Sequence, residues 1–150
     1  MKIAIGCDHG GFILKKEIVE YLKKNGYEVI DFGTDSEDAV DYSDFAVAVA
    51  KCVVAGEADF GIVMCGTGIG ISISANKVPG VRCALLSDVF SAKATRLHND
   101  ANMIAMGGRV IGAGLALEIV DAFLHTPFSE DERHVRRISK IADIEKKYSC

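Results

Sequence analysis

The chain has 150 residues, of which 49% are hydrophobic and 25% are charged, with a formal net charge of -4. This length is usual for one domain, so we expect residues 1–150 to form a single domain with its own core. The slightly acidic balance argues against a basic surface for nucleic acid. No apolar run approaches the roughly 18 residues that span a bilayer, so we expect a cytoplasmic protein without a membrane partner.

The cysteine pattern indicates reduced thiols rather than a structural framework. Five cysteines form an odd set without a CxxC pair: Cys7, Cys52, Cys65, Cys83 and Cys150. Such a set disfavours both disulfide pairing and a zinc site, and no two histidines have metal-ligand spacing. We therefore expect no metal and no cofactor. Every cysteine except Cys65 is expected to be a small buried residue or a neutral tail residue.

Short β-branched runs alternate with segments of helical period, and turn signals separate them. The predicted strands cover residues 2–6, 28–32, 60–65, 82–86 and 102–106. The predicted helices cover residues 11–25, 42–56, 69–77, 89–98, 111–125 and 131–147. Strands joined by helical crossovers indicate a parallel, doubly wound sheet, although the strand order stays open. Ligands of such folds bind beyond the carboxyl ends of the strands.

The first predicted strand ends in an acid and a histidine on a glycine-rich turn, Gly6-Cys7-Asp8-His9-Gly10-Gly11. Asp8 and His9 would both point into the crevice, where an imidazole titrates near neutral pH and a carboxylate accepts a hydroxyl proton. The simpler interpretation is that Asp8 caps the following helix and His9 lies on the surface. These residues alone leave both interpretations open.

The third predicted strand ends in Cys65-Gly66-Thr67-Gly68-Ile69-Gly70, whose three glycines let backbone amides converge on an anion. A thiol that faces those amides and a helix N-terminus should favour its thiolate form, so Cys65 is a candidate base or nucleophile. Three familiar phosphate-binding motifs do not fit this loop. A dinucleotide fingerprint needs glycine at the position of Ile71, and a phosphatase loop needs arginine there. A P-loop would need lysine after its last glycine. The alternative is a glycine-rich turn with a buried cysteine.

Further candidate binding residues, most of them histidine or arginine, follow later in the chain. His98 and Asn99 close a predicted helix, where the helix dipole alone also favours a histidine. Arg109 follows the fifth predicted strand, and Arg133 and Arg137 lie four apart on one helix face, where like charges repel unless an anion lies between them. Alternatively, these arginines form a solvated basic face. The other two histidines are expected at the surface or in an interface: His125 and His134.

Taken in order along the chain, these motifs resemble the type B ribose-5-phosphate isomerases. The resemblance rests on the two glycine-rich strand ends and on Asp41-Tyr42, His98-Asn99-Asp100, Gly108-Arg109-Val110 and Arg133-His134 with Arg137. It implies a three-layer α/β/α fold around a five-stranded parallel, Rossmann-like sheet. It also implies a homodimer or homotetramer whose active sites are shared between subunits, with the helix at about 131–147 at the dimer interface. The wider family includes allose-6-phosphate and galactose-6-phosphate isomerases.

The resemblance further implies roles in the interconversion of ribose 5-phosphate and ribulose 5-phosphate. Cys65 would be the base that moves a proton between neighbouring carbons, and Asp8, His98 and Thr67 would open the sugar ring. The phosphate would be held by His9, Arg109, Arg133 and Arg137. The sugar would be positioned by Tyr42 and Asn99. The enediolate would be bound by the backbone of Gly66, Gly68, Ile69 and Gly70. Some family members carry a glutamate base where this chain has Ile71, which leaves Cys65 as the base in this loop.

A nucleotide-binding or flavin-binding module is the alternative from another class, because the same alternation of strands and helices produces that fold. The failed fingerprint around Gly66 and the position of the thiol argue against it. The sequence does not decide between a five-carbon and a six-carbon sugar phosphate, because that choice depends on the depth of the crevice.

Overall fold

The computed structural model describes residues 1–148, so Cys150 lies outside the described residues. Its five-stranded sheet is parallel and has the order β2-β1-β3-β5-β4. The strands are β1 (Lys2–Cys7), β2 (Glu28–Asp31), β3 (Phe60–Cys65), β4 (Cys83–Leu85) and β5 (Met103–Gly107). The helices are α1 (Phe12–Lys24), α2 (Tyr42–Val54), α3 (Ile69–Ala75), α4 (Val89–Asn99), α5 (Ala113–His125) and α6 (Glu132–Tyr148). The predicted fold class is confirmed, and each predicted element is present with ends that agree within two residues.

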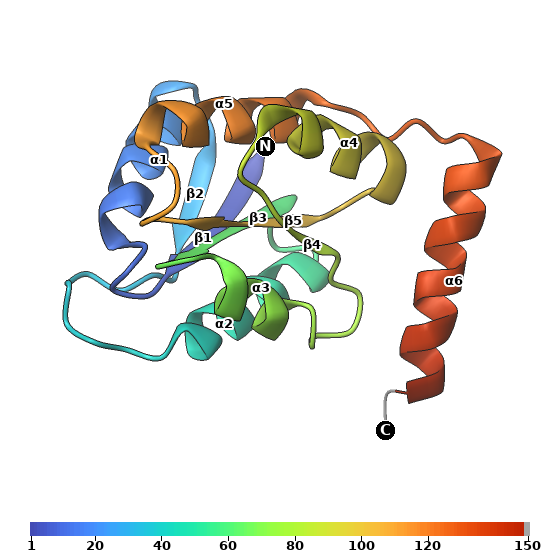
Figure 1. Ribbon diagram of the computed structural model, residues 1–150, viewed down its shortest axis with the longest axis horizontal. Helices are drawn as coiled ribbons and strands as arrows, with labels where there is room; N and C mark the ends of the chain where they lie inside the picture. The colour runs from blue at the N-terminus through green and yellow to red at the C-terminus, as the bar shows by residue number, and fades with distance from the viewer. Residues whose placement is uncertain (149–150) are drawn as a thin grey trace.

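Helices cover both faces of the sheet, with α1, α4 and α5 on one side and α2 and α3 on the other (Figure 1). Successive side chains of a strand point to opposite faces. In β3, Ile62 and Met64 therefore pack into the core under α1, α4 and α5, whereas Val63 and Cys65 pack into the core under α2 and α3. Burial on both faces explains why this strand is continuously apolar.

Helix α6 stands apart from these layers beside the end of α4 (Figure 1). His134 is its one buried residue among those described, and Val135, Ile141 and Ile144 are 49%, 46% and 60% exposed. Ile141 and Ile144 lie three residues apart on one face of the helix, and such a helix gains most of its stability by packing an apolar stripe against a partner. Within residues 1–148, this apolar stripe of α6 stays exposed. No helix within residues 1–148 combines the length and apolar character needed to cross a bilayer.

The loops after the three central strands contact one another through glycine backbone. A Cβ at Gly10, after β1, would lie 2.7 Å from the amide nitrogen of Gly66, after β3. A Cβ at Gly108, after β5, would lie 2.5 Å from the carbonyl oxygen of Gly10. The Gly108 amide also donates to the carbonyl oxygen of Cys65 at 2.9 Å. Because only glycine permits such an approach, the three strand ends form one close-packed edge.

This packing predicts that Gly108→Ala destabilises the protein by about 1 to 3 kcal/mol, since the new methyl group displaces the backbone of Gly10. The matched control is Gly114→Ala in the first turn of α5, where an added Cβ meets nothing within 4 Å. The control should leave stability unchanged or raise it slightly, because alanine favours helix over glycine. Urea unfolding at one fixed protein concentration measures both. Equal effects of the two substitutions would contradict the close packing.

Candidate active site

Cys65 is the last residue of β3, the central strand of the sheet. Its side chain is buried, and the Gly68 amide donates a hydrogen bond to its sulfur at 3.1 Å. Gly68 has φ 77°, a left-handed conformation that favours glycine, and this turn aims the amide back at the thiol. An amide donor aimed at sulfur stabilises a negative charge there.

The other described cysteines are in surroundings that oppose ionisation. Burial raises the pKa of the Cys7 thiol to about 12, although the nearby Lys15 ammonium acts in the opposite direction. Burial also raises the pKa of Cys83 to about 12 and raises that of Cys52. These thiols stay protonated at neutral pH, and a protonated thiol is a poor base or nucleophile.

Asp8 and His9 follow β1 and lie beside the Cys65 loop. The buried Asp8 carboxylate accepts hydrogen bonds through Oδ1 from the amides of Gly10 at 2.8 Å and Gly11 at 3.2 Å. It therefore stabilises the turn before α1 rather than capping the helix, because the N-cap of α1 is Gly11 and no side chain caps it. His9 is half-buried rather than on the surface, and its Nδ1 accepts from the Val40 amide at 3.3 Å.

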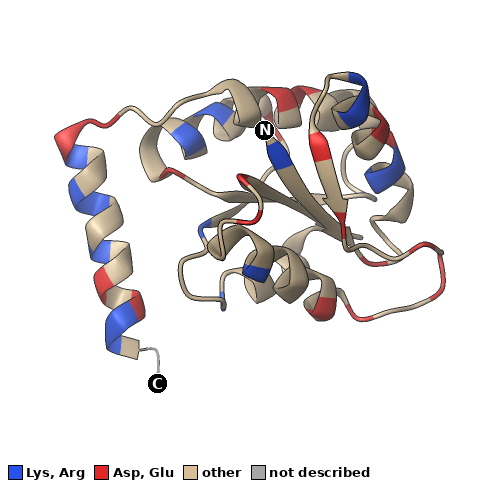
Figure 2. Cartoon of the chain, turned by 180° about the vertical axis from the view of Figure 1, so that it is seen from behind, with Lys and Arg blue, Asp and Glu red and all other residues tan. Residues whose placement is uncertain are grey.

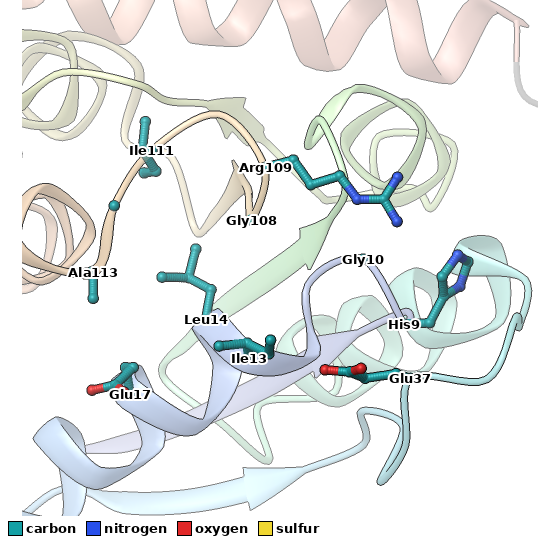
Figure 3. A pocket seen from close by; sticks show the side chains of 11 residues that line it. His9, Gly10, Ile13, Leu14, Glu17, Glu37, Gly108, Arg109, Ile111 and Ala113 are labelled. Carbon is teal, nitrogen blue, oxygen red and sulfur yellow. The ribbon is translucent and has the colours of Figure 1, made fainter.

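A cavity of about 480 Å³ opens next to this turn. Figure 3 shows the His9 imidazole and the Arg109 guanidinium extending toward the same end of it, on either side of Gly10. Arg109 also borders the Cys65 loop, because a Cβ at Gly66 would lie 3.5 Å from the Nη1 atom of Arg109. Cys65 itself is not in the cavity lining, which reaches the Cys65 loop through Gly10, Gly108 and Arg109. The cavity thus offers an anion two cationic or donor groups at one end.

Two further predicted residues lie on the same edge. The ring of Tyr42, at the start of α2, presses on the first turn of α3, since a Cβ at Gly70 would lie 2.6 Å from its Cζ. Thr67 is exposed between Cys65 and Gly68, and its hydroxyl oxygen accepts from the Ile69 amide at 3.3 Å. The structure therefore gathers Asp8, His9, Tyr42, the Cys65–Gly70 loop and Arg109 at the carboxyl edge of the sheet.

His98 and Asn99 lie elsewhere, because α4 runs back across the sheet and ends just before β5 begins, at the opposite edge. There the His98 ring lies 4.5 Å from the ring of His134 at the start of α6. Arg133 and Arg137 are exposed on the same helix, whose basic residues are visible in Figure 2. The four residues His98, Asn99, Arg133 and Arg137 form a second cluster, away from Cys65 within one chain.

A network of charged residues holds the turn that carries His98 and Asn99. Asp100 ends α4 with φ 44°, a left-handed conformation that is unusual for a residue other than glycine. Its carboxylate accepts from Arg96 at 2.7 Å and from Arg82 at 3.2 Å. Arg96 is itself buried and lies over the ring of Phe60, 4.8 Å from the ring centre. This network was not predicted, because its members come from three separate segments.

His134 is buried within the chain, which differs from the expectation for this residue. It was expected at the surface or in an interface, but it is only 4% exposed within the chain and pairs with the Ser129 hydroxyl at 2.8 Å. Burial lowers its pKa below the ordinary 6.5, and the positive charges of His98, Arg133 and Arg137 lower it further, against the opposing effect of Asp131. His134 is therefore the neutral centre of the second cluster. No signal in the sequence distinguished it from the exposed His125.

This shift predicts a loss of stability in mild acid. Because the pKa of His134 is lowered in the folded protein, the unfolded chain binds a proton there more readily. The contribution of His134 to the free energy of unfolding should be fully present above the pKa of the unfolded chain. It should be lost as the pH drops through the lowered pKa of the folded protein. His134→Gln should reduce this fall and His125→Gln should not, as urea unfolding at pH about 7.5 and about 5 would measure. Identical pH dependence in both variants would contradict the assignment.

Among residues 1–148, no group of three or more His, Cys, Asp and Glu side chains is arranged to hold a metal ion. The fold and the site together define an α/β enzyme that takes a small anionic substrate: a thiol under an amide, a carboxylate and an imidazole meet at the edge where such folds bind ligands. No cofactor-binding motif accompanies them.

Comparisons with known proteins identify the class further. The chain belongs to the ribose/galactose isomerase family, whose sequence model matches residues 3–141. This confirms the predicted resemblance and the predicted enzyme class, a sugar isomerase. A ribose-5-phosphate isomerase B of Escherichia coli is 51% identical over 146 residues, which are 97% of this chain and 97% of that protein.

Solved structures agree with this assignment. Ribose-5-phosphate isomerase B of Clostridium thermocellum matches with a TM-score of 0.97 and 58% identity, over 99% of this chain and 100% of that chain. Ribose-5-phosphate isomerase B of Mycoplasma genitalium, solved with bound ribulose-5-phosphate, matches with a TM-score of 0.92 and 42% identity, over 97% of each chain.

Proposed function

We propose that this protein interconverts ribose 5-phosphate and ribulose 5-phosphate without a metal, with Cys65 as the base. The observation that carries the proposal is the Gly68 amide aimed at the Cys65 sulfur on the ligand-binding edge of the sheet. The names of the E. coli and C. thermocellum proteins, and the ribulose 5-phosphate in the M. genitalium structure, support this choice of substrate.

The proposed chemistry moves one proton between two neighbouring carbons of the opened sugar. The Cys65 thiolate takes the proton from the carbon beside the aldehyde, and the electron pair left on carbon shifts toward the carbonyl oxygen. The resulting enediolate is stabilised by the amides of Gly66 to Gly70. The sulfur-bound proton exchanges with water, and the thiol then gives a proton to the former carbonyl carbon, while the hydroxyl proton on the neighbouring oxygen moves to the former carbonyl oxygen to complete the ketose. The proton count and the oxidation state of the protein are unchanged at the end.

The ring must open first, and the phosphate must be held throughout. Asp8 and His98, with help from Thr67, would move protons between the anomeric hydroxyl and the ring oxygen. His9, Arg109, Arg133 and Arg137 would bind the phosphate, while Tyr42 and Asn99 position the sugar. The cavity end between His9 and Arg109 suits the phosphate, since both side chains can donate to its oxygens.

The position of the second cluster supports a homodimer with shared sites, which is part of the proposal. His98, Asn99, Arg133 and Arg137 lie at the sheet edge opposite Cys65, so in this proposal each site takes them from the partner subunit. The uncovered apolar stripe of α6 supports this arrangement, because a second chain would bury it. The charges also match, because Glu17 and Glu37 line the cavity and α6 is basic near its start.

Six-carbon sugar phosphates are the alternative substrates, because the family description covers galactose as well as ribose isomerases. The purified protein should turn over ribose 5-phosphate faster than allose 6-phosphate.

The free thiols of the four described cysteines suit the cytoplasmic location that we propose.

Two cysteine variants test the proposed base. Cys65→Ala should lose turnover of ribose 5-phosphate and still bind it, because the base is removed and the phosphate-binding groups remain. Cys52→Ala, which removes another buried thiol, on α2, should keep turnover and is the matched control. Full activity of Cys65→Ala would rule out the proposed base.

Mixing Cys65→Ala chains with His98→Ala chains tests whether the sites are shared. Each homodimer is inactive, but a mixed dimer carries one site with both residues intact. After unfolding and refolding together, random pairing should restore about a quarter of the wild-type specific activity. A mixture that stays inactive, although size measurements show that mixed dimers have formed, would contradict the exchange of His98 between subunits.

A further inference from the structure

Lys15 is a buried charge to which the proposed reaction assigns no role. The residue is only 3% exposed on α1, and its Nζ lies 3.0 Å from Asp31 Oδ2, at the end of β2. It also donates to the carbonyl oxygen of Thr34 at 2.9 Å. Burying an ammonium group is costly unless its partners are in place, so this geometry constrains the segment that supplies them.

That segment is the loop of residues 32–41, which joins β2 to α2 and contains no helix or strand. Lys15 holds its first part, where a Cβ at Gly33 would lie 2.8 Å from Lys15 Cδ. Further along, Glu37 forms part of the cavity wall beside His9 (Figure 3). Near its end, the Val40 amide donates to His9 Nδ1 at 3.3 Å. The loop therefore connects the buried lysine to the imidazole.

The contact with Val40 decides which nitrogen of His9 carries the proton. A backbone amide can only donate, so Nδ1 must accept, and the neutral ring then holds its proton on Nε2. This leaves Nε2–H as the donor that the ring can offer to an anion in the cavity. If the loop moves, the ring loses both its orientation and the preference for this tautomer.

We propose that Lys15 is a positioning residue: by holding the 32–41 loop, it fixes the orientation and the tautomer of His9 for binding of the substrate phosphate. This rests on the proposed function, in which His9 binds that phosphate. Lys15 does not touch the substrate and acts through Thr34, Asp31 and the Val40 amide. Its removal therefore affects the affinity for the phosphate group rather than the proton transfer at Cys65.

The test variant is Lys15→Met, which removes the charge and keeps most of the side-chain length. Asp31 is not left as a buried unpaired charge, because its side chain is 37% exposed and it still accepts from the Gly33 amide at 2.8 Å. The variant should therefore fold. The matched control is Lys16→Met, which changes the adjacent exposed lysine of the same helix.

Lys15→Met should raise the KM for ribose 5-phosphate and the dissociation constant of inorganic phosphate by the same factor, about three- to tenfold, with a smaller change in kcat. In a His9→Gln background it should add no further loss of phosphate affinity. Lys16→Met should change neither constant. An equal loss of phosphate affinity with and without His9, or an unchanged affinity in a folded Lys15→Met protein, would overturn the proposal.

Nitrogen NMR of the imidazoles gives a readout that does not require turnover. The chain has 4 histidines, and His9→Gln assigns the relevant signal. Wild-type protein should show the Nε2–H tautomer for His9, and Lys15→Met should show a mixture of tautomers. A tautomer that is unchanged by Lys15→Met would count against the proposal, whereas a failure of the protein to turn over ribose 5-phosphate would count only against the proposed function.

Discussion

The close contact of three glycine backbones after β1, β3 and β5 is the constraint on which the site depends. Gly10 approaches Gly66, and Gly108 approaches Gly10, at distances that leave no room for a Cβ. Because no side chain separates the loops, Asp8, Cys65 and Arg109 reach one small region from three neighbouring strands. The sulfur and its amide donor are then set by backbone geometry, which close packing keeps rigid. Chemistry at a strand edge needs such rigidity, since small displacements of reacting groups are costly.

The second consequence of the topology is a division of the polar residues between two edges. A crossover helix of a parallel sheet starts at the carboxyl edge and returns to the amino edge, so α4 carries His98 and Asn99 away from Cys65. The α6 helix adds its arginines to the same distant cluster. Under our proposal, the two clusters belong to different sites, each completed by a partner subunit. The buried His134 and the Asp100 network would then hold the second cluster of one chain in place for the active site of its partner.

Much of the fold could be predicted because its signals are local. Helical spacing and glycine punctuation located the elements, and the continuous apolar runs indicated a sheet buried on both faces. The motifs after β1 and β3 could be recognised because glycine, cysteine and aspartate stand together in the sequence. The strand order β2-β1-β3-β5-β4 could not be predicted, because several orders satisfy the same crossovers. The burial of Lys15 and of His134 could not be predicted, since their partners Asp31, Thr34 and Ser129 are identified only by the tertiary structure.

Under our proposal, the Cys65 sulfur takes the proton from one carbon and gives a proton to the next, and hydrogen exchange measures this step. Ribose 5-phosphate is incubated in heavy water with wild-type protein or with Cys65→Ala, and NMR follows the hydrogen on the carbon beside the aldehyde. Wild-type protein should replace this hydrogen with deuterium, whereas Cys65→Ala should bind the sugar phosphate and leave the hydrogen in place. Deuterium incorporation by Cys65→Ala at the wild-type rate would show that another group is the base.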